Sequence, residues 1–513
     1  MSLRTVALFS LVAAGPLGWP PAVAQQIENG DFEAGATGTW ELGDDGSPVE
    51  VVPAPGGSGR ALLLESAGPG ASFSQLFELA PDSATVYELS FRIKTELGDS
   101  SRAHVWANQL AAPGQRVAGA QGGPLTGESD WRTYRHDIVV TPRTRAVRVG
   151  GSLAGAGRAW FDDFAFRPVE LDTADVTLAP AAAAYVAAVV DTLRTHAVHR
   201  GTLDFGAVLA TVRYLARGAE SPADTYAAIQ AALALLDDNN HSRLYTPDRL
   251  RAMLGGMDLR EVLAKESAGE SPYLTEPALD LDSLRAAIRF GRSRLLSGPV
   301  GYVSLPGFTH GHHAAHTLFV DSTQAMIRDL DAVPGLRGWV LDLRGNHGGA
   351  TPAMVSSAGP LLGPGNRADY VDAGGQTESS FSYRDGAYVE ADGARGDSAE
   401  VFRSSLDYRA GRRDLPIAVL VGGQTGSAAE GLLALLMGEP GVRVFGTPTA
   451  GFTTGNRMVA LSDGAGLNVA GSYLATRDGR VLTGPIAPDV VVREDPDADT
   501  DATLAAALAW LLE

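Results

Sequence analysis

The chain has 513 residues, a formal net charge of −19 and no cysteine. This length predicts two or three domains, and the acidic balance argues against nucleic acid or an anionic membrane surface as a partner. The absence of cysteine excludes thiol catalysis and Cys-bound zinc.

Residues 1–24 have the pattern of a secretory signal peptide. Arg4 precedes the short apolar run VALFSLVAAGPLG, and residues 22–24 (Ala-Val-Ala) fit the small-x-small rule for cleavage. We therefore expect an exported protein, periplasmic or extracellular, whose mature chain begins at Gln25, with an ordinary buried helix as the alternative interpretation. No later apolar run reaches the roughly 18 residues that a membrane helix needs, so no membrane span is predicted.

Residues 25–170 are predicted to form an all-β sandwich. Apolar and polar residues alternate in YELSFRIKT (87–95) and YRHDIVV (134–140), as is typical of half-buried strands. The opening NGDFEAGATGTW and the closing GRAWFDDFAF resemble the first and last strands of jelly rolls of the carbohydrate-binding-module type. This resemblance implies carbohydrate as a candidate partner of the sandwich.

Three tryptophans and two aspartates of this region have two interpretations each. Trp40, Trp131 and Trp160 either stack on sugar rings or belong to the core, because tryptophan is largely buried on average. Asp162 and Asp163 either bind a structural cation together with loop carbonyls or are solvated charges at the end of a strand.

After residue 170 the spacing of apolar residues becomes typical of helices, and from residue 298 onward strand and helix patterns alternate. Residues 171–250 repeat apolar residues at spacings of three and four, which predicts a small helical bundle that finishes in DDNNHSRLYTP. We interpret residues 251–297 as a linker or insert. Across 298–513, buried strands such as GWVLDLRG and IAVLVGG alternate with helices such as SAAEGLLALL, which predicts α/β layers around a largely parallel sheet.

The segment GGQTGSAAEGLLALL places Ser427 at a hinge between an apolar strand and a helix. One interpretation is a helix N-cap, because Glu430 three residues later would complete a capping box. The other is a nucleophile, because the free N–H groups at a helix start stabilise a developing oxyanion. A serine hydroxyl is a weak nucleophile, however, unless a base accepts its proton.

A glycine-rich turn in WVLDLRGNHGGAT is a second place for chemistry. It follows an apolar strand and carries Asp342, Arg344 and Asn346. Gly348 and Gly349 permit backbone conformations that other residues resist, so successive N–H groups can converge on an anion. The functional interpretation is an oxyanion-binding loop, and the alternative is an ordinary tight turn between a strand and a helix.

Histidines supply two further candidates. His241 lies in a polar turn after an amphipathic helix, where it is either a general base or a surface residue. The segment FTHGHHAAH contains His310, His312, His313 and His316. His312 and His316 have the i, i+4 spacing of a helical metal pair, but no glutamate lies between them, and a polar loop before a helix is the alternative.

Together these segments resemble one family, the C-terminal processing (tail-specific) protease and tricorn-core family of serine peptidases. The resemblance covers roughly 175–495 and rests on six segments in the family's order: LLDDNNHSRLYTP, VGYVSLPGF, GWVLDLRGNHGG, TGSAAEGLLALL, VRVFGTPTAG and PIAPDVVV. It implies a layered α/β peptidase core of the ClpP/crotonase type. It also implies hydrolysis of peptide bonds through an acyl-enzyme, without a metal or an organic cofactor.

The resemblance assigns roles residue by residue. Ser427 matches the nucleophile, and His241 matches the general base of the tricorn-like branch. Gly348 and Gly349 match the loop whose N–H groups form part of the oxyanion hole, and the N–H of Ala428 would supply the other donor.

Two departures concern catalytic groups. Phe452 stands where one branch of the family has a catalytic lysine, so a Ser–Lys dyad is excluded by this alignment. Thr483 is the nearest match to the glutamate that orients the histidine in the other branch, so the third triad member is unknown. Asp238 and Glu430 are candidates that the resemblance does not support.

A third departure concerns recognition. About 50 residues separate Pro247 from Gly298, too few for the PDZ module of many relatives, so capture of a hydrophobic C-terminus by such a module is not expected. The sequence thus predicts an exported serine endopeptidase that acts on protein or peptide substrates. The alternative is a non-catalytic or weakly catalytic protein that binds peptide or polysaccharide on a peptidase fold. A metal enzyme that uses the clustered histidines is a third hypothesis.

Overall fold

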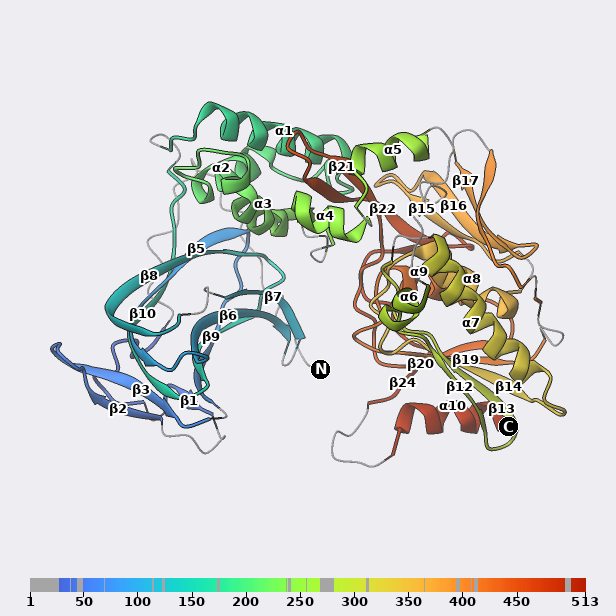
Figure 1. The fold of residues 1–513 in the computed structure, drawn as a ribbon, viewed down its shortest axis with the longest axis horizontal. Coiled ribbons are helices and arrows are strands. Elements are labelled where there is room, and N and C mark those ends of the chain that lie inside the picture. Colours follow the sequence, from blue (N-terminus) through green and yellow to red (C-terminus); the bar gives the residue numbers. More distant parts are fainter. Residues whose placement is uncertain are drawn as a thin grey trace, which may run out of the picture. The chain divides into compact units, whose positions relative to one another are not determined.

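The computed structural model describes residues 27–513 except 37, 44–48, 69, 113–114, 122–124, 173–175, 237, 239–240, 255, 268–280, 311–312, 364, 394–396, 407, 410–413 and 494–499. The predicted signal peptide and His312 lie outside the described residues. The chain divides into two compact units, residues 1–171 and 172–513 (Figure 1). Within the described ranges, none of the helices has the length and apolar character that crossing a membrane requires.

The first unit is a sandwich of two five-stranded antiparallel sheets (Figure 1). The strand orders are β1-β4-β9-β6-β7 and β2-β3-β10-β5-β8. Side chains alternate between buried and half-buried along most of β5, because successive side chains of a strand point to opposite faces. The predicted all-β jelly-roll sandwich is therefore confirmed. Its strands are β1 (Glu41–Leu42), β2 (Val49–Pro53), β3 (Arg60–Ser66), β4 (Ala71–Glu78), β5 (Thr85–Leu97), β6 (Arg102–Ala112), β7 (Gln115–Gln121), β8 (Glu128–Val140), β9 (Ala146–Ala154) and β10 (Gly157–Pro168).

The tryptophans of the sandwich divide into two groups. Trp40 and Trp160 are 4% and 5% exposed, so both belong to cores and sugar stacking is ruled out for them. Trp131 is half-buried. Its indole N–H donates to Pro55 O at 2.9 Å, and the Arg92 guanidinium lies 4.9 Å from its ring centroid. One face of the Trp131 ring is therefore covered by a cation.

The two aspartates also differ from each other. Asp162 is buried, and burial together with the charge of Asp163 raises the pKa of its carboxyl to about 6. Asp163 is exposed, and the guanidinium of Arg92 lies 3.6 Å from Asp162 Oδ2 and 3.1 Å from Asp163 Oδ2. Asp162 is thus no solvated charge, while cation binding at this pair stays a prediction.

The second unit begins with the helical segment. Its helices are α1 (Pro180–His196), α2 (Phe205–Leu215), η1 (Ala223–Thr225), α3 (Tyr226–Ala232) and η2 (Leu233–Leu236). Their apolar faces share one core with Leu461, Leu467 and Val469 from a β-hairpin further along the chain. The bundle therefore packs on the sheet that contains this hairpin, and the polar turn with His241 leads from the bundle into that sheet.

The segment predicted to be a linker or insert contains regular structure in its described part. It includes α4 (Pro247–Met253, which starts before it), α5 (Leu259–Ser267), α6 (Leu281–Ala287) and β12 (Arg292–Leu296). Strand β12 pairs antiparallel with β13 (Val300–Ser304) and forms one edge of a six-stranded sheet.

That six-stranded sheet has the order β12-β13-β14-β19-β20-β24 and is parallel from β13 onward. Its remaining strands are β14 (Gly338–Asp342), β19 (Ile417–Val421), β20 (Val442–Gly446) and β24 (Val490–Val491). Every residue of β14 and β19 is buried, because helices cover both faces as in other parallel sheets. In Figure 1, α10 (Ala502–Leu512) covers one face, and α7 (His313–Asp331), α8 (Thr351–Ala358) and α9 (Ala428–Leu436) lie over the other. The predicted α/β layers are confirmed.

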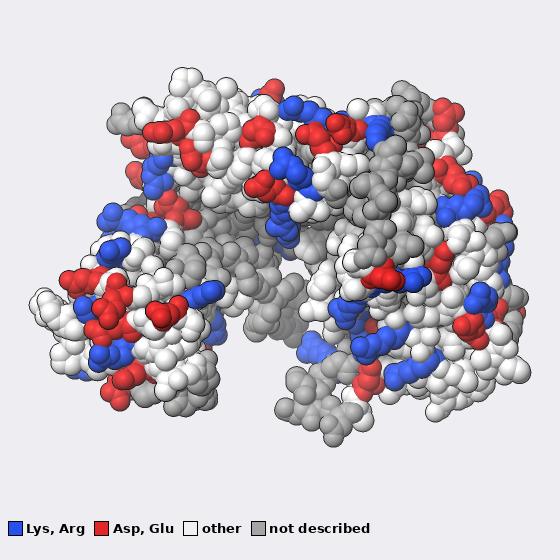
Figure 2. Space-filling model, in the orientation of Figure 1, with Lys and Arg blue, Asp and Glu red and all other residues white. Residues whose placement is uncertain are grey.

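An eight-stranded sheet completes the unit, with the order β11-β22-β15-β16-β17-β18, and β21 and β23 also pair with β22. Its elements, with the short helix η3, are β11 (Arg243–Tyr245), η3 (Gly359–Leu361), β15 (Ala368–Val371), β16 (Thr377–Arg384), β17 (Ala387–Asp392), β18 (Ser398–Arg403), β21 (Thr454–Ala460), β22 (Gly466–Thr476) and β23 (Val481–Leu482). On the face shown in Figure 2, acidic and basic side chains are interspersed over each unit.

Candidate active site

Ser427 lies between β19 and α9, at the end of a turn that the hydroxyl of Thr425 stabilises. The hydroxyl of Thr425 donates to Leu343 O at 2.8 Å and accepts from the N–H of Gly422 at 3.0 Å. Ser427 itself has φ +56° and ψ −120°, a region that residues with a Cβ rarely adopt and that costs about 1–3 kcal/mol. The half-buried serine is therefore held in an unfavourable backbone conformation at the first turn of a buried helix.

His241 reaches this serine from a position 186 residues earlier in the chain, and its Nε2 lies 3.2 Å from Ser427 Oγ. The buried carboxylate of Asp238 holds the histidine turn, because it accepts the N–H groups of His241 at 3.2 Å and of Ser242 at 3.0 Å. Asn468 Nδ2 donates to His241 O at 3.2 Å. The turn is thus fixed by its backbone, and the imidazole projects to the serine.

Uncharged groups surround the imidazole. Its ring centroid lies 5.1 Å from that of Phe452, so the residue that replaces the family's lysine packs against the base. The Nδ1 atom lies 2.6 Å from Thr454 Oγ1, and Nε2 lies 3.0 Å from Asn456 Nδ2. Burial and, to a smaller extent, the charge of Arg243 lower the pKa of His241 to about 4. The ring is therefore neutral at pH 7 and able to accept a proton.

Glu430 does not bind the imidazole of His241, as a triad acid would, but binds groups at the start of α9 and before β21. Its Oε2 accepts the N–H of Ser427 at 2.8 Å, and its Oε1 accepts the hydroxyl of Thr449 at 2.5 Å and the N–H of Gly451 at 2.9 Å. Burial raises the pKa of this carboxyl to about 7. Glu430 thus ties the start of α9 to the segment before β21, and both of its oxygens are used in doing so.

The glycine-rich turn lies against Ser427. Gly348 has φ +90°, and a Cβ at this position would lie 2.7 Å from Ser427 Cβ and 2.8 Å from Ala428 N. The N–H of Gly348 donates to Asn346 Oδ1 at 2.8 Å, so this amide is occupied. Among the described residues, the N–H groups of Gly349 and Ala428 donate to no protein acceptor. Two unoccupied amides therefore flank Ser427.

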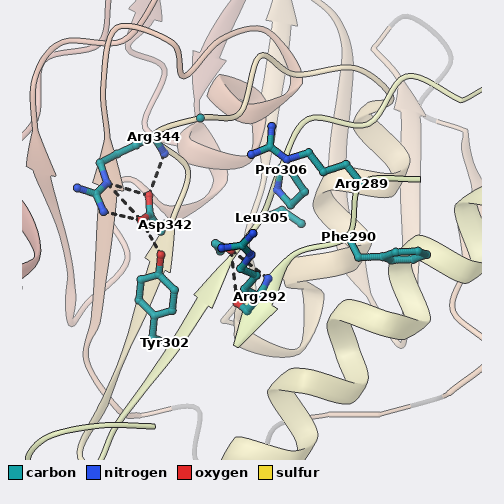
Figure 3. Close-up of a pocket in the computed structure, with 10 residues that line it drawn as sticks. Arg289, Phe290, Arg292, Tyr302, Leu305, Pro306, Asp342 and Arg344 are labelled. Carbon is teal, nitrogen blue, oxygen red and sulfur yellow. Dashed lines mark hydrogen bonds and ion pairs between the residues drawn. The ribbon is translucent and has the colours of Figure 1, made fainter. Parts of the chain in front are cut away.

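The polar residues at the start of that turn form an ion-pair cluster (Figure 3). Asp342, at the end of β14, accepts from Arg344 Nη2 at 2.7 Å and from the hydroxyl of Tyr302 at 2.8 Å. Arg344 also binds Asp501, which caps α10 through the N–H of Leu504. Tyr302, Asp342 and Arg344 line a separate cavity of about 420 Å³ that Ser427 does not line. Asp342 and Arg344 therefore hold the turn in place.

A cleft of about 960 Å³ opens at Ser427, Ala428 and Gly349. Apolar side chains line it beside α9, including Phe381 and Leu474. The lining also includes four carboxylates, from Glu378, Glu390, Asp392 and Asp397, and three basic side chains, from His196, Arg200 and Arg457. The cleft has the concave form and mixed lining that suit a polypeptide segment.

The clustered histidines lie elsewhere in the unit. His316 is buried against the ring of Phe308, and its Nε2 lies 2.9 Å from His310 O. In the parts of the chain that the structure describes, no group of three or more His, Asp or Glu side chains is placed to hold a metal ion. His312 lies outside those parts.

The structure thus brings Ser427, His241, Gly349 and Ala428 together, and places Gly348 beside them with its amide occupied. The carboxyl groups of Asp238 and Glu430 accept hydrogen bonds from backbone amides, and in the described part of the chain neither bonds to the imidazole ring. Sequence reasoning missed Thr454 and Asn456, the side chains at the two ring nitrogens. Their spacing of two in the strand TTGN, next to the TAGF motif, was the available signal, because such residues share one face of a strand.

Comparisons with known proteins point to one family. Residues 299–492 match the family described as Peptidase family S41. The chain is 30% identical over 175 residues to the nisin-resistance protein of Lactococcus lactis subsp. lactis, covering 34% of this chain and 49% of that protein. It is 26% identical over 221 residues to the carboxy-terminal-processing protease of Bartonella bacilliformis, covering 42% and 44%. The chain spans about half the length of these curated relatives.

Among solved structures, a lipoprotein from Streptococcus agalactiae is similar to this chain with a TM-score of 0.45 and 19% identity. The similarity covers 65% of this chain and 97% of that one.

Proposed function

Because this chain contains a peptidase domain of family S41, we propose that it is an exported serine endopeptidase with Ser427 as nucleophile and His241 as general base. The observation that carries the proposal is the 3.2 Å contact between Ser427 Oγ and His241 Nε2 in an open cleft. This distance is at the limit of hydrogen-bond reach for a nucleophile and its base, and such contacts are often long in the absence of substrate.

The proposed reaction follows acyl transfer. Ser427 Oγ attacks the scissile carbonyl carbon while its proton moves to His241 Nε2, and the carbonyl electrons collect on the oxygen. Collapse of this intermediate breaks the C–N bond, and His241 returns the proton to the leaving amine. Water, deprotonated by the same imidazole, then releases the acyl group and restores Ser427.

The oxyanion would be stabilised by Gly349 and Ala428. Their N–H groups donate to no protein acceptor among the described residues, and Ala428 is the first residue of α9, where the helix dipole adds positive charge. Gly348, also implied by the family resemblance, would act by leaving room for the substrate, since its own N–H is bound to Asn346.

The substrate is proposed to be an extended peptide or an unfolded protein segment. The four carboxylates of the cleft and the net charge of −19 favour peptides that carry positive charge. Nisin is one peptide to include in the assay, because a relative is named for resistance to it. Export rests on the signal-peptide pattern, and carbohydrate binding by the sandwich stays a prediction.

The first experiment compares wild type with Ser427→Ala on peptides and denatured protein. We expect kcat to fall by at least about 10³-fold, as for other catalytic serines. Ser293→Ala is the matched control, because Ser293 is an exposed serine of the edge strand β12 and should keep full activity. Equal rates in wild type and Ser427→Ala would end the assignment.

A fluorophosphonate probe separates the enzyme from the alternative of a binding protein. Labelling that maps to Ser427 and disappears in Ser427→Ala supports the peptidase. Saturable peptide binding without labelling supports the non-catalytic alternative instead. The same labelling after treatment with a strong chelator tests the metal-enzyme hypothesis, which requires loss of activity.

A further inference from the structure

The second ring nitrogen of His241 contacts a hydroxyl. Thr454 Oγ1 lies 2.6 Å from Nδ1, the position at which a triad acid would lie. The two nearby acids have other partners: Asp238 accepts backbone N–H groups of the histidine turn, and Glu430 accepts the N–H of Ser427 and groups of the segment before β21. Thr454 is therefore the side chain in position to orient the ring.

Strand pairing fixes this contact. Thr454 opens β21 and pairs with Tyr473 of β22, while Arg243, two residues after His241, pairs with Asn468 of the same strand. A threonine side chain is stiff at χ1 because it is branched at Cβ. Base and hydroxyl are thus both held by β22, and their relative position does not depend on a mobile loop.

The hydrogen bonds around the ring favour one tautomer. Asn456 Oδ1 lies 3.4 Å from Thr454 Oγ1, a long contact through which the threonine hydroxyl donates. With its proton used there, the oxygen accepts Nδ1–H. The NH₂ group of Asn456 can only donate, so its 3.0 Å contact with Nε2 requires an unprotonated Nε2. The hydroxyl of Ser427, 3.2 Å from the same atom, is then free to donate to it.

We propose that Thr454 is the positioning residue of this site, and that its hydroxyl, in place of an acid, holds His241 in the Nδ1–H tautomer that accepts the proton of Ser427. This inference rests on the proposed function. Asn456 contributes by accepting from Thr454, and its amide shares Nε2 with Ser427 until substrate enters the cleft.

The hydroxyl of Thr454 can orient the imidazole ring, but it carries no negative charge that would stabilise the imidazolium. The other groups around the ring do not supply such stabilisation either. Among the described residues, the charged groups near the ring are Arg243, two residues along the chain in β11, which lowers the pKa of His241, and the carboxyl groups of Asp238 and Glu430, which are bound to backbone N–H groups. The other neighbours, Phe452 and Asn456, carry no charge. Activity should therefore fall as His241 protonates near pH 4, and a change in activity nearer pH 7 would report protonation of Glu430, because burial raises the pKa of that carboxyl to about 7.

The test removes the hydroxyl and then restores it. Thr454→Val keeps the shape of the side chain but cannot accept Nδ1–H. We therefore expect kcat to fall by roughly 10²-fold or more, as it does in triad enzymes whose histidine is held in the wrong tautomer. Thr454→Ser should recover most of that loss. Thr453→Val is the matched control, because Thr453 is the preceding buried threonine, and within the described ranges its hydroxyl makes a single long contact, 3.4 Å from Gly484 O.

Two readouts respond to positioning and not to general damage. Nitrogen-15 NMR of histidine-labelled protein, with His241→Gln to assign the signals, should show Nδ1–H in wild type and loss of that tautomer in Thr454→Val. Thr454→Asp places a carboxylate at Nδ1, so the pKa of His241 and the acid midpoint of kcat/KM should rise by one or more pH units.

The results of these experiments distinguish failure of the proposed role of Thr454 from failure of the proposed peptidase function. If Ser427→Ala is inactive but Thr454→Val retains wild-type kcat, or Thr454→Ser rescues nothing, the role of Thr454 is wrong and the peptidase stands. An Nε2–H tautomer in wild type overturns the inference even if Thr454→Val fails to fold. If Ser427→Ala remains fully active, the proposed function itself fails.

Discussion

At the scale of single residues, the site depends on two unusual backbone conformations that face each other. Ser427 has φ +56°, and Gly348 opposite it has φ +90° and no room for a Cβ. Strain of this kind persists only where the surrounding structure imposes it. Here Thr425 holds the turn before Ser427, and Asn346 binds the N–H of Gly348.

This geometry predicts the effect of Gly348→Ala. The added Cβ would lie within 2.8 Å of both Ser427 Cβ and Ala428 N, so it must displace the nucleophile or the proposed oxyanion donor. We expect kcat/KM to fall by about 10²-fold or more, the cost of losing one oxyanion donor. Peptide hydrolysis and probe labelling measure the loss.

Gly345→Ala is the matched control in the same turn, because a Cβ at Gly345 meets no heavy atom within 4 Å. It should keep activity close to wild type. Similar activity in Gly348→Ala and Gly345→Ala would show that the close approach at Gly348 does not matter for the reaction.

At the scale of elements, one buried carboxyl group, that of Glu430, joins the start of α9 to the segment before β21, the strand that contains Thr454. Glu430 is fully buried, and its two oxygens accept the N–H groups of Ser427 and Gly451 and the hydroxyl of Thr449. Thr449 in turn accepts the N–H of Ile486. Ser427 and the segment before Thr454 are therefore linked through Glu430.

Glu430→Gln should uncouple these elements. One carboxylate oxygen becomes an NH₂ group that faces donors, and a buried donor left without an acceptor costs about 1–3 kcal/mol. Denaturant unfolding should show a loss of that size, and kcat should fall with it. Glu400→Gln, which alters an exposed pair with Arg403, is the control and should change the free energy of unfolding by less than about 1 kcal/mol. Equal stability in the two variants would contradict the role of Glu430.

At the scale of the whole molecule, the chain has two units with separate cores. The sandwich has a core rich in aromatic residues, with Phe73, Phe161 and Phe164 in contact. The second unit has its main core between the six-stranded sheet and α7, α8 and α9, and a smaller one beneath α10. Each unit can therefore unfold as its own cooperative block.

Calorimetry should resolve two unfolding transitions. A covalent inhibitor on Ser427 should raise the Tm of only the transition of residues 172–513, because a ligand stabilises the state that binds it. Phe161→Leu should lower only the other transition, through a cavity in the sandwich core. A single transition that both changes shift would contradict independent cores, and Ser427→Ala treated with the inhibitor is the control for specificity.

The layers of this protein can be predicted from its residue pattern alone. The alternating pattern of residues 87–95 and the all-apolar run of β19 predict a half-buried and a fully buried strand, and both are present, because side-chain periodicity follows from which faces meet water. The sequence also pointed to Ser427 and His241, because the segments around them resemble family motifs that can be recognised without a structure.

The groups around His241 could not be predicted in this way, because long-range packing brings them together. Thr454 meets His241 because β21 and β11 both pair with β22, a long-range arrangement that no local pattern encodes. The structure likewise shows that the N–H of Gly348 is occupied, and it directs the carboxylates of Asp238 and Glu430 to backbone amides. Local periodicity reports which face of an element is buried, but the partner of a polar atom depends on strand register and close packing between segments far apart in the chain.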